Sequence, residues 1–163
     1  MKKHTSRTLD ALVTAECMRQ RNLWFDKYIH VGTYPLAVVE NGYIQIPKQY
    51  QDEFSAMAAG CQDLHSKIEH IGCSGCNTTT WNKELKNAFK LRLGGNVGDR
   101  SPITRCKNKI GNCAEQHGAN FVFNEIEHHG GKGDVDNMAF TKAIRPRTMT
   151  VHDYCSNCQT LFA

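Results

Sequence analysis

Two cysteine motifs, far apart along the chain, place the strongest constraint on how it can fold. In the first, Cys113 stands two residues before Glu115 at the start of an expected helix. The second, Cys155-Ser156-Asn157-Cys158, lies far downstream. Three thiolates and one carboxylate are enough to hold a zinc ion with one coordination position open to water, and to move a proton of that water. The fold is therefore expected to bring both motifs together.

The 163 residues predict one domain over 1–163, in which 1–110 supply helices and a hairpin and 111–163 supply the zinc-site core. The net charge of +4 is mildly basic. Such a charge permits an anionic partner such as nucleic acid but does not require one.

The sequence has no apolar run long enough to cross a bilayer, and no membrane partner is expected. The N-terminal run 1–7 is charged but is not followed by the apolar stretch of a secretory signal peptide. A place in the cytoplasm of the producing cell is expected, or delivery by a route that does not use such a signal.

Eight cysteines are present, and an even count is compatible with disulfides. Two Cys-x-x-Cys pairs without a signal peptide favour metal binding. For the first pair, Cys73 and Cys76, packed cysteines without a metal are the leading interpretation. A second zinc site with Cys61 or Cys106 stays open.

The pattern of apolar and turn residues predicts an α/β fold, bordering on α+β, in which a small central sheet is packed by helices and carries a helical N-terminal elaboration. Helical spacing predicts helices over 6–28, from Pro47 to Ile71, and over 81–91. The dipeptide Asn41-Gly42 predicts a hairpin between 34 and 47.

The second half begins with a long basic loop over 99–112, which leads into a helix over 113–127. Gly118 and Ala119 are small, so this helix can lie close to a sheet. A strand over 137–144 follows, and Asp153 is expected to cap a short final helix that carries Cys155 and Cys158.

The chemistry of the two motifs follows from this placement. Cys155 and Cys158 share one face of a helix, and Cys113 lies at the start of another, where the helix dipole favours thiolate. At a helix start, the Glu115 carboxylate can reach water on the metal and accept its proton. Three thiolates leave the zinc site at net −1, and Arg145 or Arg147 are candidates to offset that charge.

Gly111-Asn112-Cys113-Ala114-Glu115 together with Tyr154-Cys155-Ser156-Asn157-Cys158 resembles the cytidine deaminase-like superfamily, and within it the bacterial toxin branch of YwqJ-like deaminases. The resemblance covers about residues 111–162. It implies that Cys113, Cys155 and Cys158 are zinc ligands, that Glu115 is the proton shuttle, and that the two motifs start neighbouring helices on a sheet. Tyr154 departs from the pattern, because the family usually has proline at this position.

The resemblance also implies an activity, the conversion of cytosine to uracil in nucleic acid by a toxin or effector domain. The domain would act in the cytoplasm of a target cell and have an immunity protein as partner. Asn112, Arg145, Arg147 and Tyr154 are candidates for contacts with a nucleic acid or nucleotide substrate, and the basic residues of 100–109 could meet phosphates. Tyr154 or Trp81 could stack on a base.

Two other interpretations use the same residues. In the first, Cys73, Cys76, Cys155 and Cys158 form a closed structural Cys₄ zinc site in a binding module. In the second, the chain is a His-Asn metal nuclease. The candidate residues for the nuclease are Glu127, His128, His129, Asp134, Asp136, Asn137 and His152.

Overall fold

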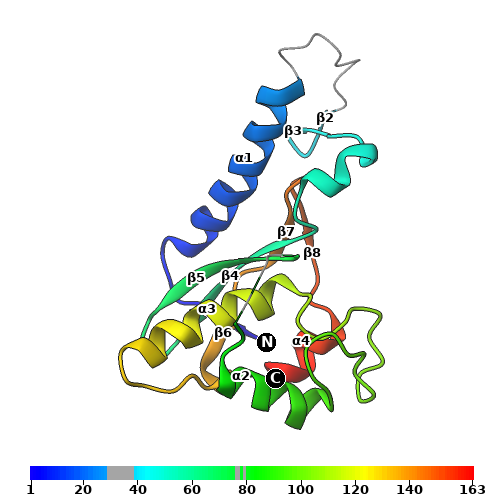
Figure 1. Cartoon of the computed structure of the whole chain (residues 1–163). Coiled ribbons are helices and arrows are strands. Elements are labelled where there is room, and N and C mark those ends of the chain that lie inside the picture. Colours follow the sequence, from blue (N-terminus) through cyan, green and yellow to red (C-terminus); the bar gives the residue numbers. More distant parts are fainter. Residues whose placement is uncertain (29–38, 76–77, 79) are drawn as a thin grey trace.

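The computed structural model describes residues 1–28, 39–75, 78 and 80–163, and a mixed β-sheet lies at its centre (Figure 1). Within these residues the sheet has six strands in the order β1-β6-β4-β7-β8, with β5 paired to β4. Their bounds are β1 Lys2–Lys3, β4 Ala58–Asp63, β5 Glu69–Cys73, β6 Met138–Phe140, β7 Ala143–Arg145 and β8 Thr150–His152. A separate hairpin consists of β2 (Val39–Glu40) and β3 (Tyr43–Ile44).

Strand β4 is the centre of the sheet. It is antiparallel to β5 on one edge and to both β6 and β7 on the other. At the break between β6 and β7, the Thr141 N–H donates to the Gly60 carbonyl at 3.0 Å, and the Gly60 N–H donates to Thr141 Oγ1 at 2.9 Å. The ladder therefore continues through the break, and the predicted strand over 137–144 is found as two short strands in one line.

Helices cover both faces of β4. Helix α1 (Leu9–Tyr28) lies on one face, where a Cβ added to Gly60 would be 2.6 Å from Leu9 Cγ. Helix α3 (Ala114–His128) lies on the other, where a Cβ added to Gly118 would be 2.2 Å from Cys61 Sγ. The close approach expected at Gly118 is confirmed.

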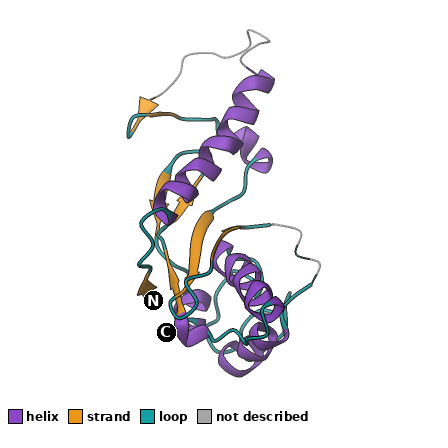
Figure 2. Ribbon diagram, turned by 90° about the vertical axis from the view of Figure 1, so that its left-hand side faces the viewer, coloured by secondary structure: helices purple, strands orange, loops and turns teal. Residues whose placement is uncertain are grey.

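Two further helical segments pack beyond α3 and complete the larger apolar core. They are α2 (Lys83–Ala88), which continues as a π-helix over Phe89–Leu93, and α4 (Ser156–Leu161). Figure 2 shows this group of helices at the end of the molecule opposite to the free end of α1. The structure is thus a mixed α/β fold, with its curled sheet packed by helices as the sequence predicts.

The helix predicted from Pro47 to Ile71 is wrong. A 3₁₀ helix over Lys48–Glu53 is followed by the β4–β5 hairpin, so the segment before residue 110 supplies the central strand of the sheet. All six residues of β4 are buried, because helices cover both of its faces. Such a strand has no alternation of apolar and polar residues, and its small residues matched a helical spacing by chance.

The predicted N-terminal helix and the predicted turn at Asn41-Gly42 are both confirmed. The helix expected over 6–28 is found as α1, and the Leu9 N–H at its start donates to Ser6 Oγ at 3.2 Å. The turn at Asn41-Gly42 has positive φ at both residues, 51° and 80°, as such a hairpin turn requires. The part of that predicted hairpin over 34–38 lies outside the described residues.

Substitution of Gly118 by alanine should destabilise the protein, although alanine normally favours a helix by about 1 kcal/mol. The added methyl would overlap Cys61 Sγ, and overpacking of this kind typically costs about 1–3 kcal/mol. Urea denaturation should show the loss, and the double substitution with Cys61→Ala should recover part of it. Equal stability of Gly118→Ala and the unmodified chain would contradict the close packing described.

Candidate metal centre

Cys113 occupies the N-cap of α3, directly before Ala114, with an extended backbone (φ −77°, ψ 146°). The loop that precedes it turns at Gly111, which has a φ of +87°. The Gly111 N–H donates to Gln116 Oε1 at 2.7 Å, so the first turn of the helix holds the loop in place. The predicted helix over 113–127 is confirmed within one residue at each end.

Cys155 occupies the equivalent position at the start of α4, and Cys158 lies in that helix, fully buried. Cys155 is itself the N-cap, in place of the predicted Asp153. The Sγ atoms of Cys113 and Cys155 are 3.1 Å apart, and the three sulfur atoms all lie within 4.8 Å of one another. The structure thus brings together the three thiols that the sequence predicted as ligands.

The geometry of this cluster fits zinc. Tetrahedral coordination with Zn–S bonds of about 2.3 Å places two ligand sulfur atoms about 3.8 Å apart. The Cys113–Cys155 separation of 3.1 Å is shorter than that value, and the other two sulfur–sulfur separations are no longer than 4.8 Å. Among residues 1–28, 39–75, 78 and 80–163, the group has three thiols and no further ligand, which matches the donor number of a site that keeps one position open. A buried group of Cys113, Cys155 and Cys158 can therefore hold a metal ion.

The Glu115 carboxyl group lies beside the thiols and is only 5 % exposed. The Cys158 thiol donates to its Oε2 at 3.7 Å. Burial raises the pKa of Glu115, and no Lys, Arg or His among the described residues forms a salt bridge with it. A carboxyl group in this setting can carry a proton closer to neutral pH than an exposed one.

The pKa values of the three thiols are shifted in different directions. Hydrogen bonds from Cys113 and Cys158 lower the pKa of Cys155, which is the acceptor of the group. The contact with Cys155 raises the pKa of Cys113, the contacts with Cys113 and then with Cys155 raise the pKa of Cys158, and burial raises both further. The direction of these shifts makes Cys155 the thiol of the group that loses its proton most easily.

Contacts that the sequence did not predict fix the second motif against the basic loop. Asn157 is fully buried between Cys155 and Cys158. Its side-chain amide donates to the Asn108 carbonyl at 2.9 Å, and its Oδ1 accepts a hydrogen bond from Thr104 Oγ1. Because asparagine is common in surface turns, nothing in the pattern marks it as buried.

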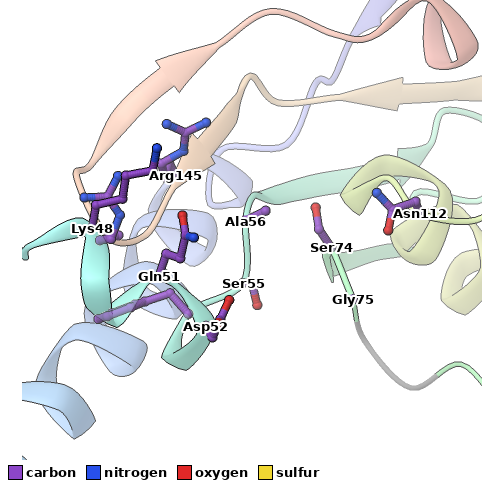
Figure 3. A pocket seen from close by; sticks show the side chains of 11 residues that line it. Lys48, Gln51, Asp52, Ser55, Ala56, Ser74, Gly75, Asn112 and Arg145 are labelled. Carbon is purple, nitrogen blue, oxygen red and sulfur yellow. The ribbon is translucent and has the colours of Figure 1, made fainter. Parts of the chain in front are cut away.

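Three of the four predicted substrate residues line one cavity of about 530 Å³, namely Asn112, Arg145 and Arg147 (Figure 3). The fourth, Tyr154, lines a separate cavity of about 430 Å³ and donates through its hydroxyl to the Thr141 carbonyl at 2.9 Å. Trp81 packs against Phe89 and His117 in the core. The structure thus groups Asn112 with the two arginines and places Tyr154 elsewhere.

The structure gives little support to the closed Cys₄ zinc site or to the His-Asn nuclease. Cys73 packs beside Val13 and Cys17 under α1, in a different cluster from Cys158, and Cys76 lies outside the described residues. For the nuclease, His128 ends α3, and Asp136 forms a salt bridge with Arg92 at 2.9 Å. In the described residues, only the three thiols form a metal-binding group of three or more.

Comparison of the chain with protein-family models, with curated proteins and with solved structures finds no match. The resemblance of the two motifs to cytidine deaminase-like proteins therefore stays a prediction. Among the described helices, none combines the length and apolar character needed to cross a membrane.

Serine in place of Cys113, Cys155 or Cys158 should remove bound zinc, which the intact cluster should hold at about one equivalent per chain. The reason is that a hydroxyl is a far poorer zinc ligand than a thiolate. Elemental analysis of the purified, dialysed proteins measures the metal directly. Cys106→Ser is the matched control, because Cys106 is outside the cluster. Full zinc content in Cys113→Ser would contradict the assignment.

Proposed function

We propose that the protein is a zinc-dependent deaminase of the cytidine deaminase-like type, which converts cytosine to uracil in nucleic acid. The observation that carries the proposal is the buried Glu115 carboxyl group beside a cluster of three thiols. A structural Cys₄ site needs four ligands and no carboxylate. Three ligands with an adjacent carboxyl group are the arrangement of a hydrolytic zinc enzyme.

Each side chain has a separate role in this proposal. Cys113, Cys155 and Cys158 hold the ion, which when bound supplies a water activated as a nucleophile. Glu115 would take one proton of the water and pass it to N3 as the oxygen adds to C4 of the base, and would then take the remaining hydroxyl proton and pass it to the departing amino group. The exocyclic C–N bond is broken, a carbonyl replaces it, and cytosine and water give uracil and ammonia.

The environment of Glu115 suits a group that must both take and give a proton. Its raised pKa makes the protonated form more accessible than in an exposed glutamate, so the proton can be held between the two steps. Burial excludes bulk water, which would otherwise exchange that proton.

The arrangement of the elements supports the same proposal. The resemblance implies that the two motifs start neighbouring helices packed on a sheet. Cys113 and Cys155 are the N-cap residues of α3 and α4, and strand β6–β7 separates these helices along the chain. The toxin or effector role, with an immunity protein as partner, is proposed from the resemblance alone.

Glu115→Gln should abolish uracil formation, with a loss of about 10²–10⁴-fold or more, because glutamine keeps the shape but cannot carry the proton. Mass spectrometry of single-stranded DNA, duplex DNA, RNA and nucleosides after incubation with the zinc-loaded protein measures uracil, uridine and inosine. Glu125→Gln, on the same helix, should keep activity and zinc. If the zinc-loaded protein gives no deaminated product with any of these substrates, the proposal fails.

A further inference from the structure

A cavity next to the metal centre carries an excess of positive charge that the proposed chemistry does not use (Figure 3). The wall of the cavity is formed by the 3₁₀ helix and the segment that joins it to β4, and by the two residues that follow β5. The residue before Cys113, the end of β7 and the β7–β8 turn complete it. The lining residues are Lys48, Gln51, Asp52, Phe54, Ser55, Ala56, Ser74, Gly75, Asn112, Arg145 and Arg147. A cavity of about 530 Å³ is large enough for a nucleotide-sized ligand.

The charges in this wall are unbalanced. Lys48, Arg145 and Arg147 are cationic, and Asp52 is the one acidic residue of the lining. Within the described residues, neither Lys48 nor Arg145 forms a salt bridge, and Arg147 donates through Nη1 to the Ile46 carbonyl at 2.8 Å. Cations that outnumber the acidic groups on one concave surface attract an anion.

Neutral hydrogen-bonding groups complete the surface. Ser55, Ser74, Gln51 and Asn112 line the same cavity and can donate hydrogen bonds to phosphate oxygens. Figure 3 shows these groups arranged from the 3₁₀ helix, across the end of β5, to the start of α3. The donor set is that of a phosphate site, because carboxylate ligands for a cation are almost absent.

The cationic wall is held in place from behind by a buried residue. Arg21 is 1 % exposed and donates to the Pro146 carbonyl at 3.0 Å and to the Arg147 carbonyl at 2.8 Å. It also donates to the Ile44 carbonyl. The turn that carries Arg145 and Arg147 is therefore tied to α1 and to the small hairpin, and binding needs little rearrangement of its backbone.

The cavity and the thiol cluster lie on the same end of α3. Asn112 lines the cavity and directly precedes Cys113 in the chain. Ala114 packs against Ala59 of β4 and Ala143 of β7, and β7 ends at Arg145. A ligand that reaches from the cavity to the thiols therefore passes the N-terminal end of α3.

We propose that this cavity binds a phosphodiester of a polynucleotide strand next to the base that is deaminated. The inference rests on the proposed function and adds to it the residues that hold the strand and the single-stranded form of the substrate. The strand phosphate bound by Lys48, Arg145 and Arg147 positions the base at the metal centre. The target base must be unpaired to enter, so a single strand is the expected form.

Direct binding to a fluorescent single-stranded oligodeoxycytidine tests the inference without requiring turnover. The zinc-loaded Glu115→Gln protein is used, and anisotropy gives the dissociation constant at several salt concentrations. Lys48→Ala and Arg145→Ala should each weaken binding by about 3–10-fold and reduce the salt dependence by about one counterion. Asp52→Asn should tighten binding, because it removes the opposing charge. Inorganic phosphate should compete.

Lys90→Ala is the matched control, since Lys90 is also exposed but lines none of the cavities described. Unchanged binding in both Lys48→Ala and Arg145→Ala, with zinc content intact, would overturn the phosphate site even if the protein deaminates. Weakened binding in these variants supports the site even if no deamination is found. The opposite effect of Asp52→Asn separates a charge effect from misfolding, which would weaken binding in every variant.

Discussion

Close backbone contact between α3 and the middle of the sheet is the constraint on which the rest of the structure depends. A Cβ added to Gly72 of β5 would lie 2.0 Å from the Ala114 carbonyl, and one added to Gly118 would meet Cys61 of β4. The start of α3 is therefore fixed against two strands, and with it the position of Cys113. Strands β6 and β7 pair with the other edge of β4, and β8 pairs with β7. The chain then continues from β8 to Cys155.

The elements around the two motifs could be predicted because their local signals agree with the tertiary structure. The small residues of α3, the strand after it and the short cysteine helix each follow from the residues alone. Strands β4 and β5 could not be predicted from the sequence pattern. Strand β4 is buried on both faces, so its apolar and polar residues do not alternate. Gly60 in the middle of β4 favours neither a helix nor a strand clearly. The position of the central strand was therefore set by packing that the sequence pattern does not display.

The same division holds at the site. The clustering of Cys113, Cys155 and Cys158 beside Glu115 was predictable, because metal chemistry allows few side chains at few spacings. Asn157 acts through contacts with the distant Asn108 and Thr104, which no local pattern reveals. The residues Lys48, Gln51 and Asp52 were missed for a further reason, since they belong to the segment whose structure was predicted wrongly.

The positions of the thiols along the chain have a consequence for folding. Cys113 and Cys155 are 42 residues apart, so an ion held between them is a cross-link that closes a long loop. Helix α4 has only six residues, too few for a helix to be stable in isolation. With the proposed ion bound, the packing of α4 against the π-helix Phe89–Leu93 would be linked to the free concentration of the metal by mass action. In a zinc-poor solution, α4 and the loop docked on Asn157 are the parts expected to loosen first.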